Sequence, residues 1–280
     1  MQAKETKLQD IIEGTKQYIV PLFQRTYSWT SKEWESLWKD LVELCETENP
    51  RTHFIGSIVS MPTVSVPEGV AKYLLIDGQQ RLTTIFIILT LLRNKAIALG
   101  NNEFASEIND TLLVNPYKKD IDHFKLMPTQ VDREVYIGLI EGKVSDVDSK
   151  ITKAYDYFEK KLKQTKLPHE KIKQIITGYF SVVSIVLDSD DNPYLVFESL
   201  NAKGRPLTQS DLIRNYLFMR IHVDKQIDIY HNYWLPMQKA LEDNLTEFIR
   251  HFLMKDGALI KQADVYYALK EKVSPKNAIE

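Results

Sequence analysis

The stretch Tyr73-Leu-Leu-Ile-Asp-Gly-Gln-Gln-Arg81 decides the fold. Its apolar first half predicts a strand, and the residues that follow, from 82 to about 99, have the length and composition of a helix. Gly100 suits the C′ position of that helix. We therefore expect a strand that passes through a tight turn at residues 77–81 directly into a long helix.

A second β-rich run lies at residues 53–60, and the segment after it contains Pro62, Pro67 and Gly69. Because such residues end strands and form turns, the two β-rich runs are expected to pair with each other. Further upstream, residues 16–21 predict another short strand.

The rest of the chain predicts an α+β fold. The spacing of Thr30 and Glu33 is that of a capping box at the start of a helix. We expect a small mixed sheet with helices in residues 1–128 and a mainly helical subdomain in residues 129–280. A strand-like run at 180–187 interrupts the helices and is a candidate to return to the first sheet. The later helices are expected at 149–165, 168–179, 193–200, 208–221, 226–242 and 245–255.

The composition is that of an ordinary globular protein, with 280 residues, 44% of them hydrophobic, and a formal net charge of −2. This balance argues against disorder and against a nucleic-acid binder driven by overall positive charge. The start of the chain lacks the apolar core of a signal peptide, and residues 82–92 are too few for the roughly 20 that span a bilayer. The single cysteine, Cys45, allows no internal disulfide. We expect a soluble, cytoplasmic protein without membrane contact.

The turn at residues 77–81 has the chemistry of an anion site. The first turn of a helix offers unpaired N–H groups, Gly78 lets a ligand approach the backbone, and Arg81 presents a fork suited to phosphate oxygens. Asp77 would repel bare phosphate, but it suits a divalent metal that bridges phosphates, or the orientation of a water. The alternative is structural: Asp77 caps the helix and Arg81 pairs with a surface acid.

The loop at residues 21–29 carries aromatic, amide and guanidinium side chains where small polar residues are usual. This mixture is expected where a planar nucleotide group is stacked and hydrogen-bonded. The alternative is that the aromatic rings cover the core by packing on the tryptophans of the next helix. The side chains concerned are Phe23, Gln24, Arg25, Tyr27 and Trp29.

A third polar group lies in residues 196–215. A turn at residues 201–206 leads into a helix that Thr208 and Asp211 begin, and polar side chains recur on one face of that helix. Together with the turn they would complete a metal or ribose site. The alternative is a capped helix-turn-helix with a surface ion pair. The residues concerned are Glu198, Asn201, Asp211, Arg214 and Asn215.

The basic stretch at residues 150–173 contains eight lysines and His169 against three acids. It could contact a phosphate backbone, although such lysines are more often the solvated faces of amphipathic helices. The six histidines show neither HxxxH nor HExxH spacing, so no zinc site is predicted. Walker A and GxGxxG sequences do not occur, which excludes the usual P-loop and Rossmann signatures.

These blocks, in this order, resemble the DUF262 domain, which is the N-terminal domain of GmrSD-type, modification-dependent restriction proteins. The resemblance covers about residues 8–220, and its most specific part is the Asp-Gly-Gln-Gln-Arg block. The blocks that carry it are Pro21-Leu-Phe-Gln-Arg-Thr-Tyr-Ser-Trp29, His53-Phe-Ile-Gly-Ser-Ile58, Leu75-Ile-Asp-Gly-Gln-Gln-Arg-Leu-Thr-Thr84, Phe197-Glu-Ser-Leu-Asn-Ala-Lys-Gly-Arg-Pro-Leu-Thr208 and Asp211-Leu-Ile-Arg-Asn215.

The resemblance implies a ParB/sulfiredoxin-like fold, nucleoside triphosphate hydrolysis and defence against phage or foreign DNA that carries modifications. By position it assigns catalysis to Asp77, Gln79, Gln80 and Arg81, and metal binding to Asp77, Glu198 and Asp211. It assigns nucleotide binding to Gly78, Thr83, Gln24, Arg25, Asn201 and Arg214, and DNA sensing to Phe23, Tyr27 and Trp29.

The expected function is therefore Mg²⁺-dependent hydrolysis of a nucleoside triphosphate, coupled to recognition of modified DNA. Two rivals stay open: a binding module for nucleotide or DNA without turnover, and a metal-dependent nuclease that acts through Glu198, Asn201 and Asp211. Many relatives continue into a nuclease domain of the His-Me finger or HNH class, and DNA cleavage is not assigned to this chain. Either the nuclease lies in a further domain or a partner protein, or this protein only senses and switches. The preferred base, the DNA modification and dimerisation are left open.

Overall fold

The computed structural model describes residues 1–63, 69–143, 147–188, 191, 196 and 207–273. The chain divides into two units. Unit 1 consists of Met1–Pro21 and Thr26–Asp191, and unit 2 consists of Leu22–Arg25 and Asn192–Glu280. The division after residue 191 replaces the expected boundary at residue 128.

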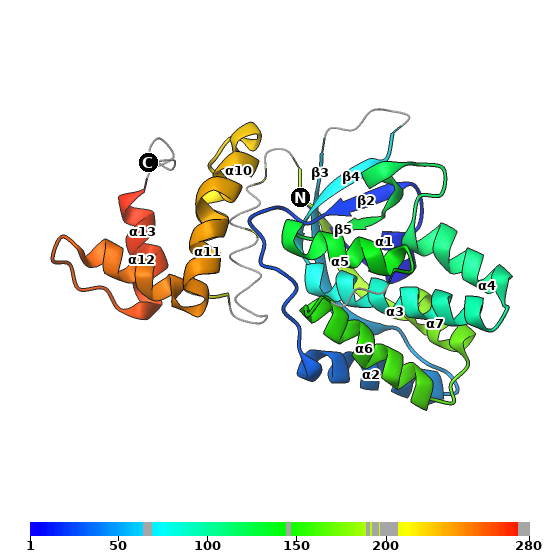
Figure 1. The fold of residues 1–280 in the computed structure, drawn as a ribbon. Helices are drawn as coiled ribbons and strands as arrows, with labels where there is room; N and C mark the ends of the chain where they lie inside the picture. Colours follow the sequence, from blue (N-terminus) through cyan, green and yellow to red (C-terminus); the bar gives the residue numbers. More distant parts are fainter. Residues whose placement is uncertain (64–68, 144–146, 189–190, 192–195, 197–206, 274–280) are drawn as a thin grey trace. The chain divides into compact units, whose positions relative to one another are not determined.

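Unit 1 is built on a six-stranded mixed sheet (Figure 1). Its strands, in spatial order, are β1 (Gln2–Lys7), β6 (Phe180–Val186), β3 (His53–Pro62), β4 (Ala71–Asp77), β2 (Lys16–Ile19) and β5 (Leu126–Met127). The two β-rich runs, β3 and β4, pair in antiparallel fashion, as expected. β6 lies antiparallel to β1 and parallel to β3, so the strand predicted at 180–187 does return to the first sheet.

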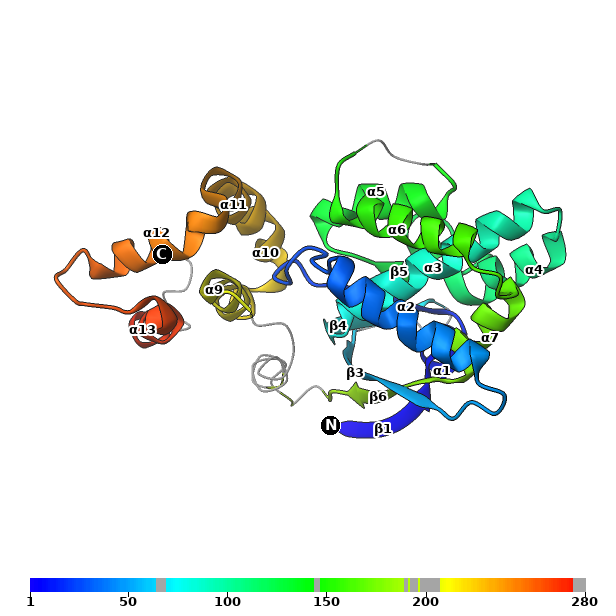
Figure 2. The same ribbon diagram turned by 90° about the horizontal axis from the view of Figure 1, so that it is seen from below.

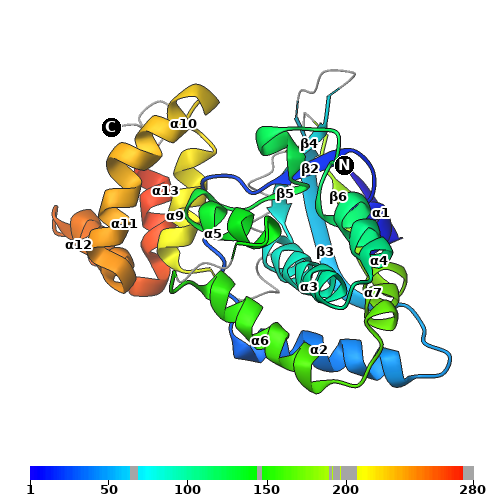
Figure 3. The ribbon, with the colours of Figure 1, turned by 45° about the vertical axis from the view of Figure 1, so that its right-hand side comes forward.

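A single helix occupies the centre of unit 1. Helix α3 (Gln79–Ala98) lies between the sheet and the pair formed by α2 (Ser31–Glu46) and α6 (Lys150–Gln164) (Figures 1 and 3). Every side chain of α3 from Leu82 to Arg93 is buried, which is the pattern of a helix covered on all sides. No helix in the part of the chain that the structure describes is both long and apolar enough to cross a bilayer.

This central helix explains why the boundary is not at residue 128. Helices α5 (Gln130–Ile140), α6 and α7 (His169–Gly178) all contact α3, and their apolar side chains join its core. A helix that is apolar on all faces must be buried on all faces, and the sheet buries only one face of α3. The later helices that take part contribute Val135, Ile151, Phe158, Ile172 and Ile176.

Smaller elements complete unit 1. The capping box predicted at the start of α2 is present, with the Thr30 N–H donating to the Glu33 carboxylate at 2.8 Å. After α3, the short helix α4 (Asn102–Glu107) runs into the π-helix η1 (Ile108–Leu113), and both contact α3. The remaining elements are α1 (Leu8–Ile12) and the 3-10 helix η2 (Asp120–His123).

Unit 2 is helical in its described part (Figure 2). Its helices are α9 (Gln209–Phe218), α10 (Val223–Ile229), the π-helix η3 (Tyr230–Trp234), α11 (Leu235–Leu241), α12 (Leu245–Met254) and α13 (Val265–Lys272), with short 3-10 turns η4 (Glu242–Asn244) and η5 (Gln262–Asp264). Their core includes Phe23 from the segment 22–25, together with Ile213, Phe218 and Tyr266. A mixed sheet with helices and a helical second unit make an α+β fold, as expected.

Candidate functional site

The turn at residues 77–81 joins β4 to α3 through a glycine at which a larger residue would be strained. Gly78 has a φ of +96°, in the left-handed region. A Cβ at this position would lie 3.0 Å from Ile58 Cγ1 and 3.1 Å from the Ser57 carbonyl oxygen. The Leu82 N–H donates to the Gly78 carbonyl at 2.9 Å, which starts the helix. The first-turn N–H groups of α3 therefore begin directly at the end of the strand.

The guanidinium of Arg81 lies over the backbone of β3. Its Nη1 donates to the Ser57 carbonyl at 2.6 Å. A Cβ on Gly56 would lie 2.3 Å from Nη2 and 2.6 Å from Cζ of Arg81, so the guanidinium fills the space where a side chain would stand. Gly56 itself has a φ of +115°. This glycine thus provides the seat of the arginine.

Within the described residues, the charge of Arg81 is not neutralised by an ion pair. Burial lowers the pKa of Arg81, and the nearby Asp77 partly opposes that effect. Among the residues that the structure describes, no carboxylate lies within ion-pair distance of Arg81, so the predicted alternative of a pairing surface acid is not supported. The guanidinium keeps a positive charge, because arginine does not deprotonate in proteins. It is therefore suited to pair with an anion from outside the chain.

Ser57 connects the aspartate and the arginine. Its hydroxyl donates to Asp77 Oδ2 at 3.2 Å, while its carbonyl accepts from Arg81. Neither Ser57 nor Gly56 is among the site residues that the sequence predicts, although both lie in the block at residues 53–58. The signal that could have found them is the pairing of this block with the strand that carries Asp77.

Gln80 points away from the turn and holds the neighbouring loop. Its Oε1 accepts from the N–H groups of Ser28 at 2.6 Å and Trp29 at 3.2 Å, and its Nε2 donates to the Thr26 carbonyl at 3.3 Å. The side chain is only 8% exposed. The Gln80 amide therefore positions the loop, and its catalytic role stays a prediction.

The neighbouring residues of α3 are equally enclosed. Gln79 and Thr83 are buried, so a role in contacting nucleotide has little side-chain surface to act through. Both are placed on the first turns of the helix beside Asp77 and Arg81. The described surface of the turn is thus made by the backbone, by Asp77 and by Arg81.

Tyr27 belongs to the core. It is 4% exposed, and its hydroxyl is hydrogen-bonded to Thr84 Oγ1 and to Trp34 Nε1, both at 2.7 Å. Burial raises the pKa of the phenol above its usual value. Phe23 is likewise buried, in the core of unit 2. The burial of these two rings favours the alternative that they cover the core, and their DNA-sensing role stays a prediction, whereas Trp29 is partly exposed.

Arg214 and Asp211 form a buried strut in unit 2. Arg214 is 3% exposed and donates to the Phe23 carbonyl at 2.7 Å, to Gln238 Oε1 at 3.1 Å and to Asp211 Oδ1 at 2.8 Å. The other oxygen of Asp211 accepts from the Thr208 N–H at 3.2 Å and caps α9. Asp211 neutralises the Arg214 guanidinium in this buried pair, and the nucleotide contact of Arg214 and the metal contact of Asp211 stay predictions.

The remaining predicted residues are only partly placed. Gln24 is buried and Arg25 is partly exposed, both in the segment of unit 2 that Arg214 holds. Glu198 and Asn201 lie outside the described residues. In the described ranges, no three His, Cys, Asp or Glu side chains gather closely enough to hold a metal ion. Of the predicted metal ligands, Asp77 stands in unit 1 and Asp211 in unit 2.

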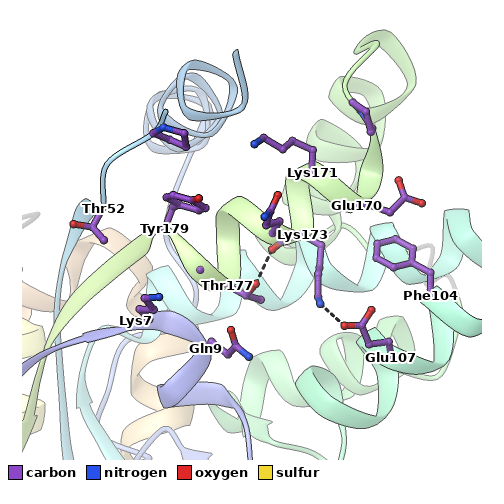
Figure 4. A pocket seen from close by; sticks show the side chains of 14 residues that line it. Lys7, Gln9, Thr52, Phe104, Glu107, Glu170, Lys171, Lys173, Thr177 and Tyr179 are labelled. Atoms are coloured by element: carbon purple, nitrogen blue, oxygen red, sulfur yellow. Dashed lines mark hydrogen bonds and ion pairs between the residues drawn. The ribbon is translucent and has the colours of Figure 1, made fainter. Parts of the chain in front are cut away.

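The basic stretch at residues 150–173 behaves as a solvated helix surface. In the described residues four of its eight lysines pair with acids, as Lys161 does with Glu35 at 2.8 Å. Lys173 pairs with Glu107 at the wall of a hollow of about 870 Å³, which contains acids and lysines together (Figure 4). Such mixed charge does not favour a nucleic-acid backbone, which requires an excess of positive charge.

Comparison with known families gives a match that spans the site. The family described as GmrSD restriction endonuclease, N-terminal domain, matches residues 8–218. That range contains the turn at 77–81, the glycine seat of Arg81 and the loop at 21–29. No curated protein matches the chain. Because the matched range covers most of the chain, the protein belongs to the family of GmrSD restriction endonuclease N-terminal domains and is part of a GmrSD-type restriction system.

Proposed function

We propose that this domain binds a nucleoside triphosphate at the turn of residues 77–81 and hydrolyses it, and that hydrolysis is coupled to recognition of modified DNA. The observation that carries the proposal is the guanidinium of Arg81, seated on Gly56 beside the first turn of α3 without an ion-pair partner in the described chain. It gives the turn a fixed positive charge that polyphosphate would neutralise.

The electrostatics of the turn support a phosphate ligand. The N-terminus of a helix carries roughly half a positive elementary charge, and its N–H groups point at an incoming anion. Arg81 adds a full charge, already partly desolvated, so it gains more from an anion than a solvated side chain would. In hydrolysis, these same groups would stabilise the negative charge that develops on the phosphoryl oxygens.

The residues also fit a magnesium ion bound together with phosphates. Mg²⁺ in nucleotide sites is typically held by one or two carboxylates plus phosphate oxygens and water. Asp77 supplies such a carboxylate, and the Ser57 hydroxyl fixes one of its oxygens. When bound, the ion would neutralise charge on the phosphates. Asp77 would hold that ion or orient the attacking water, and Arg81 would hold the phosphate.

Coupling to DNA has a physical route within unit 1. Gln80 is part of the nucleotide turn, yet its side chain holds the backbone of Thr26, Ser28 and Trp29. A ligand that shifts the first turn of α3 would therefore also shift the loop that presents Trp29. We propose that the partly exposed Trp29 senses DNA and that Gln80 transmits the state of the nucleotide to it.

The experiment is phosphate release by purified protein with Mg²⁺ and each of the four nucleoside triphosphates, with and without modified DNA. We expect turnover in the unchanged protein and its loss in Asp77→Ala and in Arg81→Ala. Arg51→Ala is the matched control, because Arg51 is an exposed arginine outside the turn. Tight nucleotide binding without release would contradict hydrolysis and identify a binding module. DNA nicking without nucleotide would favour a nuclease.

A further inference from the structure

Arg93 is a buried cation in unit 1 that the turn at 77–81 does not use. It is 6% exposed and lies in α3, about 18 Å further along the helix axis than Arg81 at 1.5 Å per residue. Burial lowers the pKa of its guanidinium. In the described residues no carboxylate forms an ion pair with it. A buried charge without a counterion destabilises the fold, and an anion bound from outside the chain would compensate it.

The hydrogen bonds of Arg93 are made to neutral amides. Its Nε and Nη2 donate to Asn94 Oδ1 at 3.1 and 2.9 Å, and its Nη1 donates to Asn109 Oδ1 at 2.8 Å. A guanidinium has five N–H donors. One N–H on each Nη atom is thus left without an acceptor in the described chain, and each of these donors can bind an oxygen of an oxyanion.

Arg93 lines a pocket of about 560 Å³ on the side of α3 that faces α4 and η1. This volume is in the range of small-molecule sites, roughly 300–1,000 Å³. Asn102 and Ser106, one turn apart on α4, are exposed and line the same pocket. Glu141 also lines it, but its carboxylate is paired with Lys143 at 2.7 Å. Asn109 stands on a π-helix, a form often found at functional sites.

We propose that this pocket binds a small phosphate-bearing molecule whose phosphate is held by the guanidinium of Arg93 and completed by Asn102 and Ser106. Phosphate is favoured over carboxylate because donors come from two elements, α3 and α4. A phosphate monoester offers three terminal oxygens to satisfy both, whereas a carboxylate offers two. The proposal does not rest on nucleotide hydrolysis at the turn, since the two arginines are far apart on the helix.

The test is calorimetric titration of the full chain with inorganic phosphate and with a nucleoside monophosphate, the matching nucleoside serving as the uncharged probe. We expect both phosphates to bind and the nucleoside to bind at least about tenfold more weakly, the ratio that 1.4 kcal/mol produces. Tighter binding of the monophosphate than of inorganic phosphate would identify a nucleotide, and equal binding would identify the phosphate group alone. Equal binding of nucleoside and monophosphate, or no binding of either phosphate, would overturn the proposal.

The decisive variant is Asn94→Asp, which supplies an internal anion. The new carboxylate would accept from Nε and Nη2 in place of the amide, and the Tyr155 hydroxyl, now 3.3 Å from Asn94 Nδ2, would donate to it. We expect a melting temperature raised by about 3 °C and phosphate binding weakened about tenfold or more. Because this variant should fold better than the unchanged protein, a loss of binding cannot be attributed to unfolding.

Two controls separate this site from the turn. Asn49→Asp makes the same change of charge at an exposed position and should leave phosphate binding unchanged. Arg81→Ala removes the anion site proposed at the turn, and in that background Asn94→Asp should weaken the remaining phosphate binding about tenfold or more. Equal phosphate binding in Arg81→Ala and in the double variant would overturn this proposal and leave the turn as the anion site.

Discussion

A methyl group on Gly56 tests whether the seat of Arg81 is as close as the structure shows. In Gly56→Ala the new Cβ would lie 2.3 Å from Nη2, 2.6 Å from Cζ and 3.2 Å from Nε of Arg81. Ordinary contacts of a Cβ are 3.4–4 Å, so the guanidinium must move by about 1 Å or more. A shift of that size breaks the 2.6 Å hydrogen bond to the Ser57 carbonyl.

The cost has two parts of known size. The clash itself is inexpensive, because the end of a flexible side chain can swing aside. The lost hydrogen bond of a charged donor costs about 1.5–3 kcal/mol. An alanine at a φ of +115° adds backbone strain of about 1–2 kcal/mol. The free energy of unfolding should therefore fall by about 2–5 kcal/mol, and nucleotide affinity should fall with it because the guanidinium has left its place.

Urea denaturation and nucleotide titration together measure this effect. Gly100→Ala is the control: Gly100 has a φ of +75°, and no atom lies within 4 Å of its added Cβ. It should show backbone strain only and keep its affinity for nucleotide. The reasoning is refuted if Gly56→Ala costs the same free energy in the Arg81→Ala background as in the unchanged protein, because the coupling energy of the two sites would then be zero.

Three further predictions concern other contacts. Gln80→Leu removes the side-chain partners of the Ser28 and Trp29 N–H groups and of the Thr26 carbonyl. The free energy of unfolding in urea should therefore fall by about 2–4 kcal/mol. A decrease no larger than that in the exposed control Gln174→Leu would contradict this prediction. Arg214→Met should speed hydrogen exchange in α9 and leave the exchange rate in α3 unchanged, because the hydrogen bonds from Arg214 to Phe23 and Asp211 lie within unit 2. Equal acceleration in both helices would contradict this prediction. Lys125 is buried and donates to the carbonyls of Ile12 and Gly14, and burial lowers its pKa to about 8. Below pH 8 both the folded and the unfolded chains bind this proton, whereas between pH 8 and about 10.5 only the unfolded chain does. The stability of the protein relative to Lys125→Met should therefore rise by roughly 3 kcal/mol across that window, and a flat difference would contradict the burial of the charge.

The strand, turn and helix around Asp77 could be predicted because their signals are local. A β-rich run, a glycine and a long apolar run follow one another within the chain, and the capping box at Thr30 is equally local. The strand at 180–187 could be predicted from its composition, whereas its pairing with β1 and β3 depends on the tertiary fold. What local signals could not give was the boundary at 191, which depends on how many helices α3 needs to cover it.

The turn that carries Asp77 and Arg81 could be predicted from the sequence, but the residues that contact these side chains could not. Gly56 and Arg81 meet only because β3 pairs with β4, a contact that depends on register rather than on spacing in the chain. A tyrosine in a loop can stack on a base, yet the ring of Tyr27 is buried and its hydroxyl is hydrogen-bonded to Thr84 and Trp34. An aromatic loop has the same pattern in sequence whether it faces solvent or the core, so only packing decides between them.

In the proposed function, Arg81 holds the polyphosphate of a nucleotide. The most direct measurement is the dissociation constant of a non-hydrolysable nucleoside triphosphate, in the presence of Mg²⁺, for the unchanged protein, Arg81→Ala and Arg51→Ala. Removal of a charged partner from an anion typically costs about 2–5 kcal/mol, so Arg81→Ala should bind at least about thirtyfold more weakly while Arg51→Ala binds normally. Equal affinity of Arg81→Ala and the unchanged protein would contradict the claim.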